Sequence, residues 1–209
     1  MDKAKINDFW AARTKVSDAR IATNYRNDGR LDFDLSLVRR YLTENSHILD
    51  LGAGTCTLSE NLLGENRKVD AVEKFSGFLE MANNHPALNK IACDIVDFVP
   101  SKKYDLILIF GVINFLSIEE ERRIYEQCVA ALGDGGTLIV KNQCGVDFEK
   151  VVDGYSEELS ATYHARYPAV MSQKSLLSEY FEVEVVDIYP AEMNRWEDTH
   201  FYAFICHVP

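Results

Sequence analysis

The 209-residue sequence lacks the features that mark membrane-spanning, secreted and zinc-binding chains. Its longest apolar stretch, Leu106 to Leu116, contains Asn114 and falls well short of the ~20 residues that a bilayer-spanning helix needs. The first ten residues carry charge throughout and do not resemble a signal peptide. Its five cysteines are scattered, with no CxxC pair and no histidine at zinc-finger spacing. We therefore expect a cytoplasmic protein with reduced cysteines, no structural metal and no membrane association.

Basic residues are scarce as well. The chain has 22 Lys and Arg against 33 Asp and Glu, a formal charge of -11. Nucleic acids are bound by clustered Lys and Arg, so a nucleic-acid partner is disfavoured. The acidity is uneven, because residues 1–47 hold nine Lys/Arg and seven Asp/Glu, a net +2. This stretch would suit an anionic substrate if it touches one, although a solvated helix surface of mixed charge explains it equally well.

Short apolar runs alternate with helical stretches from His47 onward, and 47% of all residues are hydrophobic. This alternation is typical of a single α/β domain, with a mostly parallel sheet covered by helices on both faces. Seven strands are predicted: Ile48 to Leu51, Lys68 to Val72, Lys90 to Cys93, Tyr104 to Phe110, Thr137 to Lys141, Phe181 to Ile188 and Phe201 to Ile205.

The helix after the fourth predicted strand has clear end signals. Ser117 and Glu120 have the spacing of a capping box, and Gly133 is suited to the left-handed position after the last turn. Four helices are predicted between the strands: Leu58 to Leu63, Phe78 to Asn83, Glu119 to Leu132 and Lys174 to Tyr180.

Two segments fall outside the alternation. Residues 1–45 have helical character, with Ile6, Phe9 and Trp10 at roughly helical spacing. Residues 143–172 form an irregular segment rich in tyrosine and charge. Both segments hold aromatic residues and arginine, so we expect them to form a mobile lid over the site. Removing the N-terminal arm should then abolish activity and spare much of the cofactor affinity.

The most informative motif is a buried strand that ends in Asp50-Leu-Gly-Ala-Gly54 before a helix. Glycine there lets a ligand lie against the backbone. Glu73 ends the next strand, about 20 residues on, where a carboxylate can accept hydrogen bonds from both hydroxyls of a ribose. Asp94 ends the third strand and could accept from an adenine amine. The carboxyl ends of parallel strands meet in one crevice, so these acids should lie together.

With these motifs in this order, the chain from about Ser46 to Cys206 resembles class I S-adenosylmethionine-dependent methyltransferases. Tyr104 to Phe110 resembles their fourth strand, and Gly133 to Val140 the turn and strand that follow their fourth helix. The resemblance implies S-adenosyl-L-methionine as cofactor, S-adenosyl-L-homocysteine as product, and a Rossmann-like sheet of order 3-2-1-4-5-7-6 with the last strand antiparallel. The cofactor-binding residues that it implies are Asp50, Gly52, Ala53, Gly54, Glu73, Lys74, Asp94, Ile95 and Phe110.

The glycine loop departs from the family at one position, because Cys56 stands where a third glycine is frequent. A dinucleotide fingerprint would instead need glycine at Thr57, which disfavours an NAD-dependent oxidoreductase. A second alternative is a noncatalytic cofactor-binding scaffold. The leading prediction is an enzyme, monomer or homodimer, that methylates a small-molecule acceptor on oxygen or nitrogen.

Methyl transfer needs alignment and desolvation more than a catalytic triad. Candidates for a direct role are Asn114, close to the end of the fourth strand, and His164, a possible general base in the predicted cap. For both residues an ordinary structural role is at least as well supported. The residues predicted to line the acceptor pocket are Trp10, Arg13, Tyr25, Tyr155, Tyr163, Arg166 and Tyr167.

Overall fold

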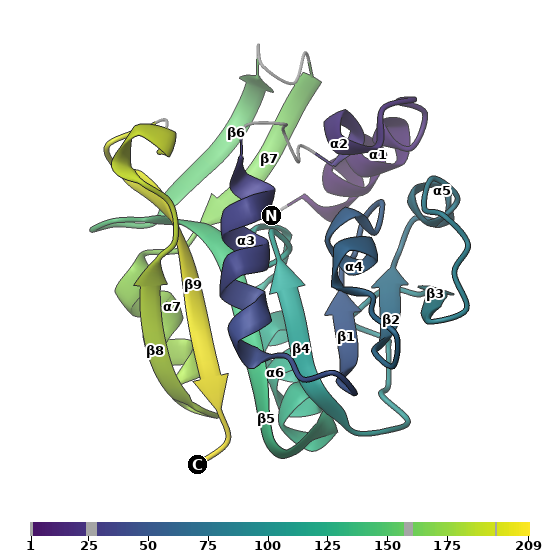
Figure 1. Cartoon of the computed structure of the whole chain (residues 1–209). Coiled ribbons are helices and arrows are strands. Elements are labelled where there is room, and N and C mark those ends of the chain that lie inside the picture. The colour runs from purple at the N-terminus through teal and green to yellow at the C-terminus, as the bar shows by residue number, and fades with distance from the viewer. Residues whose placement is uncertain (1, 24–28, 157–160, 195) are drawn as a thin grey trace.

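A seven-stranded sheet organises the computed structural model, which describes residues 2–23, 29–156, 161–194 and 196–209 (Figure 1). The order is β3-β2-β1-β4-β5-β9-β8, and β9 is antiparallel to both neighbours. Without the hairpin strands β6 and β7, this is the order 3-2-1-4-5-7-6, so the predicted fold is confirmed. The strands are β1 His47–Leu51, β2 Lys68–Glu73, β3 Leu88–Ala92, β4 Tyr104–Phe110, β5 Leu132–Gly145, β8 Glu182–Asp187 and β9 Thr199–His207.

The central strands are buried on both faces because their sequences are almost continuously apolar. In β4, Leu106 and Leu108 belong to one core cluster, and Ile107 and Ile109 belong to the other. Figure 1 shows α3 and α4 in front of the sheet and α6 and α7 behind it. The helices that cover the sheet are α3 Arg30–Val38, α4 Thr57–Leu62, α5 Ser76–Leu79, α6 Ile118–Ala131 and α7 Val170–Leu177.

The helices within the N-terminal 45 residues do not pack together as one structural unit. The short helices α1 Lys3–Arg13 and α2 Ala19–Ala22 lie beyond the carboxyl ends of the parallel strands (Figure 1). In contrast, α3 buries Leu35, Leu37 and Val38 in the core on the front face of the sheet. Only α1 and α2 can therefore belong to a lid, because α3 is part of the core.

The segment 143–172, expected to be irregular, instead contains a β-hairpin. Strand β5 runs on to Gly145, and β6 Lys150–Ser156 pairs antiparallel with β7 Ala161–Tyr167. Figure 1 shows this hairpin standing beyond the ends of the parallel strands, on the same side of the sheet as α1 and α2. Its regular strands alternate side chains between two faces, which decides below which residues reach the site.

Of the two end signals predicted for α6, the one at its start is present and the one at its end is not. At the start, both hydrogen bonds of the capping box between Ser117 and Glu120 are present, so this prediction is confirmed. At the end, the prediction for Gly133 is wrong: the backbone becomes extended at Leu132, and Gly135 is the residue with a left-handed φ of 70°. The sheet explains the difference, because Leu132 already pairs with Tyr104 of β4 and the following residues bulge out before the pairing resumes.

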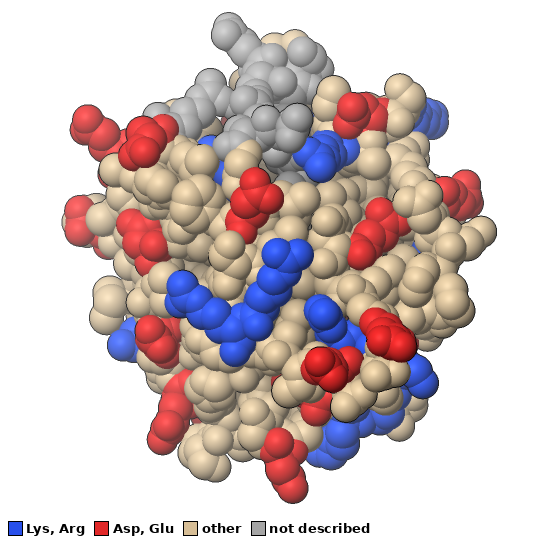
Figure 2. Space-filling view, in the orientation of Figure 1, with Lys and Arg blue, Asp and Glu red and all other residues tan. Residues whose placement is uncertain are grey.

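The surface carries charges of both signs. On the face shown in Figure 2, the acidic and basic side chains of the described residues are interspersed, and the basic ones form no continuous stripe. Among the described residues, no helix is long and apolar enough to cross a membrane.

Candidate functional site

A cavity of about 1210 Å³ lies at the carboxyl ends of β1, β2, β4 and β5. Helix α1 and the β6–β7 hairpin contribute further walls. This is the crevice expected where strands of an open parallel sheet converge. The cavity is lined by all the residues that the resemblance implied for the cofactor, which are Asp50, Gly52, Ala53, Gly54, Glu73, Lys74, Asp94, Ile95 and Phe110.

The loop after β1 needs glycine for both conformation and space. Gly52 has a φ of 80°, and a Cβ there would lie 2.3 Å from Val112 Cγ2. Gly54 has a φ of 54°, and its Cβ would lie 2.8 Å from Thr23 Cγ2. Cys56 also adopts a left-handed conformation, with a φ of 58°. The sequence departure at Cys56 therefore keeps the backbone turn that a third glycine would form, at some cost in strain.

Two buried carboxylates flank this loop. Glu73 accepts hydrogen bonds from the backbone N–H groups of Gly54 and Phe75, both at 2.9 Å. Burial raises the pKa of Glu73, although these bonds oppose the rise. Asp50 accepts a 2.6 Å bond from the Ser59 hydroxyl, and burial raises its pKa to about 6 against the effect of that bond. Burial weakens solvent screening, so a bound hydroxyl or ammonium group would interact strongly with either carboxylate.

Asp94 follows the end of the third strand and, unlike Glu73 and Asp50, forms a salt bridge with a lysine among the described residues. Its carboxylate is 2.9 Å from Lys74 Nζ and accepts a 3.1 Å bond from the backbone N–H of Val96. Burial raises the pKa of Asp94, but Lys74 and Val96 together outweigh burial and hold the pKa below its usual range. Asp94 is therefore an ionised acceptor at the edge where an adenine amine would arrive.

Five of the predicted acceptor-side or catalytic residues come together in the cavity: Trp10, Asn114, Tyr155, Tyr163 and Tyr167. Tyr163 and Tyr167 are four residues apart on β7 and therefore share one face of the strand. Burial raises the pKa of both phenols, so they stay protonated at neutral pH. In the orientation that satisfies its amide, Asn114 donates to two backbone carbonyls, of Arg166 at 3.2 Å and Gln143 at 3.3 Å.

Three others are not among the residues that line the cavity. His164 and Arg166 alternate with the two tyrosines along β7 and lie on its other face. His164 is 7% exposed, and its Nδ1 lies 2.6 Å from the carboxylate of Asp153 on β6. Arg13 donates from Nε to the Ala22 carbonyl at 3.0 Å. The remaining predicted residue, Tyr25, lies outside the described part of the chain.

Sequence reasoning missed a buried ionic cluster at the β5 side of the cavity. The Lys141 ammonium lies 2.5 Å from the Asp34 carboxylate and 2.9 Å from the Tyr189 hydroxyl, which in turn donates to Asp34 at 2.9 Å. The rings of Phe110 and Phe201 lie 4.9 and 6.0 Å from the same ammonium. The available signal was a lysine at the end of an apolar strand, but its acidic partner is 107 residues away in the chain.

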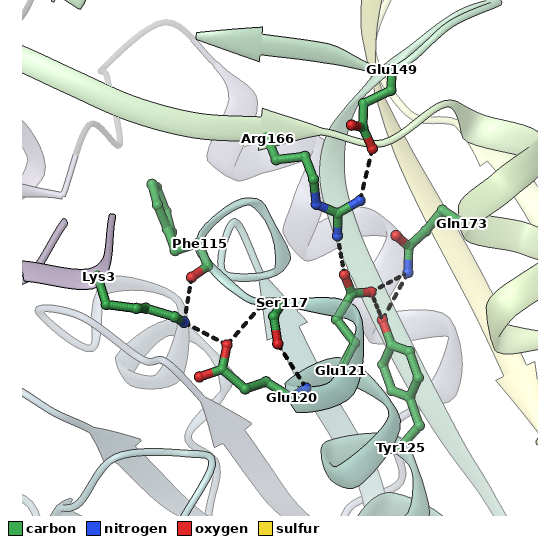
Figure 3. Close-up of polar contacts among 9 residues, drawn as sticks. All are labelled: Lys3, Phe115, Ser117, Glu120, Glu121, Tyr125, Glu149, Arg166 and Gln173. Carbon is green, nitrogen blue, oxygen red and sulfur yellow. Dashed lines mark hydrogen bonds and ion pairs between the residues drawn. The ribbon is translucent and has the colours of Figure 1, made fainter. Parts of the chain in front are cut away.

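The hairpin is fastened to the core through another buried carboxylate, shown in Figure 3. Glu121 of α6 is fully buried, pairs with Arg166 of β7, and accepts from Gln173 of α7 at 2.9 Å and from Tyr125 at 3.0 Å. Burial raises the pKa of Glu121, although Gln173 and Arg166 oppose the rise. Arg166 also reaches Glu149 at 3.1 Å. Arg166 thus anchors the strand that carries Tyr163 and Tyr167, from the face of β7 that points away from the cavity.

Comparisons with known proteins agree with this geometry. A family model for S-adenosylmethionine-dependent proline di-methyltransferases matches residues 32–190. A phosphoethanolamine N-methyltransferase from Plasmodium falciparum is 27% identical over 161 residues, 72% of this chain and 59% of that protein. A malonyl-[acyl-carrier protein] O-methyltransferase from Ilyobacter polytropus is 28% identical over 145 residues, 66% of this chain and 52% of that protein. The chain therefore spans little more than half the length of these relatives.

Solved structures share the fold. An S-adenosylmethionine-dependent methyltransferase from Leishmania major aligns with a TM-score of 0.73 at 21% identity, covering 98% of this chain and 82% of that one. A Burkholderia thailandensis 1,6-didemethyltoxoflavin-N1-methyltransferase, solved with S-adenosylhomocysteine, aligns with a TM-score of 0.70 at 13% identity, covering 87% and 79%.

The fold and the strand-end carboxylates define a class I S-adenosylmethionine-dependent methyltransferase. Within that class, the chain belongs to the family described as S-adenosylmethionine-dependent proline di-methyltransferases. Its cofactor is S-adenosylmethionine, and the residues present fit that molecule. Gly52 and Gly54 leave room along the loop, and Glu73 and Asp94 offer buried or half-buried acceptors for the ribose and adenine.

Proposed function

We propose that the chain transfers a methyl group from S-adenosylmethionine to a small-molecule acceptor. The observation that carries this proposal is a single cavity with two chemically different ends. Its volume of about 1210 Å³ exceeds the ~300–1,000 Å³ typical of a pocket for one small ligand. The cofactor residues occupy the β1–β3 end, whereas β9 and the hairpin line the other end with aromatic side chains, beside Lys141 and Gln143 of β5. A cofactor and an acceptor can therefore be held side by side.

When bound, the cofactor supplies an electrophilic methyl group. The protein aligns the two substrates and excludes water. Glu73 and Asp94 would hold the nucleoside, while Asp50 and the glycine loop would lie next to its amino-acid end. The aromatic walls exclude water, which favours displacement at a sulfonium. Asn114 is a candidate positioning residue for the acceptor, because it lines the cavity and ties the β4–α6 connection to β5 and β7. We assign His164 to its contact with Asp153 and give it no part in the transfer.

We propose a lid that is smaller than the sequence predicted, because α3 belongs to the core. Within residues 1–45 and 143–172, α1, Thr23 at the end of α2 and the β6–β7 hairpin line the cavity beyond the strand ends. Phe9 of α1 and Tyr163 of β7 meet edge to face, with centroids 5.3 Å apart, so the two pieces close on each other. Such a lid would exclude water once both substrates are present.

The acceptor end favours a compact molecule with an acidic group. Lys141 and Arg30 both line that end, next to Tyr189 and Phe201. A carboxylate or phosphate on the acceptor would meet these cations and would share Lys141 with Asp34, in accord with the net +2 charge of residues 1–47. The atom that receives the methyl group is an oxygen or a nitrogen, and the enzyme is a monomer or a homodimer.

Two measurements test the proposal. In calorimetry, S-adenosylhomocysteine should bind and NAD should not, and a preference for NAD would refute the assignment. Methyl transfer from labelled S-adenosylmethionine should then be screened against metabolite pools, with Glu73→Ala as the cofactor-site control. Tight S-adenosylhomocysteine binding with no labelled product across broad pools would instead support a noncatalytic scaffold.

A further inference from the structure

Helix α1 reaches directly into the cofactor end of the cavity. Lys3, Ile6, Asn7 and Trp10 line the same cavity as Asp94. Ile6 and Asn7 are each three or four residues from both Lys3 and Trp10, so the four residues form one stripe along the helix. The stripe faces the nucleoside end, whereas the sequence had placed this arm over the acceptor.

A chain of two polar contacts connects α1 to the adenine edge. Asn7 Oδ1 accepts a 2.9 Å hydrogen bond from Lys74 Nζ. The same ammonium lies 2.9 Å from Asp94 Oδ2. Lys74 is thus oriented from both sides, by an amide from α1 and by the carboxylate at the end of β3. The position of the Asp94 carboxylate consequently depends on α1.

A second attachment holds the start of α1 in place, as Figure 3 shows. Lys3 Nζ donates to the Phe115 carbonyl at 2.9 Å and lies 2.5 Å from Glu120 Oε2. Glu120 is itself fixed, because it accepts a 2.7 Å bond from the backbone N–H of Ser117 in the capping box. Farther along α1, the Trp10 ring meets Phe115 edge to face at 5.3 Å.

These contacts matter because α1 is weakly held otherwise. It has 11 residues, fewer than an isolated helix needs to be stable in water, and only Ile6 and Phe9 are buried. Besides these two buried side chains, α1 is attached by the ring contacts of Phe9 and Trp10 and by the polar contacts of Lys3 and Asn7. Those polar contacts end on a cofactor residue at one end and on the β4–α6 connection at the other.

We propose that α1 is part of the cofactor site, with Asn7 as a positioning residue that sets the Asp94 carboxylate through Lys74. Lys3 and Glu120 hold α1 where Asn7 can do this. The inference rests on the assignment of this end of the cavity to the cofactor. It predicts that α1 contributes to recognition of the adenine amine, so removal of the arm would damage cofactor affinity as well as turnover.

The test compares two ligands, S-adenosylhomocysteine and S-inosylhomocysteine, which carries a carbonyl in place of the adenine amine. Wild-type protein should prefer S-adenosylhomocysteine in calorimetry. Asn7→Ala should bind it about fivefold more weakly, the effect of one lost hydrogen bond, and should also lose part of the preference over the inosyl compound. Asn7→Asp keeps an acceptor oxygen for Lys74 and should restore both properties. Lys3→Met should weaken both ligands by a similar factor, chiefly through faster dissociation.

Matched controls lie on the same helix. Asp8 and Lys5 are exposed and do not line the cavity, so Asp8→Ala and Lys5→Met should leave both affinities unchanged. The proposal is overturned if Asn7→Ala matches Asp8→Ala in affinity and in preference, or if Asn7→Asp behaves as Asn7→Ala. A wild-type protein that binds neither ligand would refute the cofactor assignment itself, which is a different failure.

Discussion

The Lys141–Asp34 pair allows a quantitative prediction. Asp34 is fully buried and the Lys141 side chain is only 7% exposed. Asp34→Asn removes the negative charge and leaves the ammonium in a site of low polarity, a change that typically costs ~3–5 kcal/mol. The Tyr189 hydroxyl and the ring of Phe110, 4.9 Å away, still hold the cation, so we expect the lower end, about 3 kcal/mol. For a domain of this size that corresponds to a fall of roughly 6–12 °C in Tm.

Urea unfolding of a double-mutant cycle measures this coupling. Lys141→Met alone should also destabilise, because it removes the ammonium that lies 2.5 Å from the buried Asp34 carboxylate. The double variant Asp34→Leu/Lys141→Met should recover much of the loss, since replacing a buried ion pair by apolar residues is often neutral. The exposed pair Arg122–Glu179 is the control, and Glu179→Gln should change little.

Two outcomes would refute this reasoning: wild-type stability in Asp34→Asn, or single losses that simply add in the double variant. The same pair bears on deletion of the N-terminal arm. A truncation that begins near Leu35 would remove Asp34 along with α1, and would thereby destabilise the sheet. Point variants in α1 therefore separate the lid from the core better than truncation does.

Three further predictions concern the site. Glu73→Ala should weaken S-adenosylhomocysteine binding by roughly 1–3 kcal/mol and Asp94→Ala by somewhat less; unchanged calorimetric affinity in both would mean that the cofactor lies elsewhere. Burial raises the pKa of Asp50 to about 6 from 3.8, so the stability it contributes is present below about pH 4 and is lost as the pH rises through 6. Asp50→Asn should therefore gain up to about 3 kcal/mol relative to wild type between pH 4 and 7 in urea unfolding, and a pH-independent difference would contradict this. Arg166→Met should leave Glu121 buried without its cation, cost on the order of 3 kcal/mol, and speed amide exchange in β7; unaltered exchange there would show that the pair does not hold the hairpin.

The sheet could be predicted because each central strand can be recognised from the few consecutive residues that form it. The central parallel strands contain short apolar runs, and runs such as Leu106 to Ile109 can be buried only between two layers of helices. The cofactor acids were equally accessible, since Asp50, Glu73 and Asp94 each end such a run. Convergence of parallel strand ends then brings them together without further information.

The hairpin was missed because it carries no apolar run. Its β7 sequence alternates Tyr163, Ala165 and Tyr167 with His164 and Arg166, so both faces hold polar atoms. A period of two was nevertheless present and would have separated the tyrosines from the histidine and arginine. The cluster at Lys141 was beyond such reasoning, because its partner comes from a helix far away in the chain.

The β4–α6 connection gives the two ends of the cavity a common support. Glu120 and Glu121 are adjacent in the first turn of α6, yet they face different elements: Glu120 fastens α1 through Lys3, and Glu121 fastens β7 through Arg166 (Figure 3). The first contact serves the cofactor end and the second the acceptor end. Because both start from one capped helical turn, a shift of that turn would move both walls together. The walls proposed for the cofactor and for the acceptor are therefore both anchored at the start of α6.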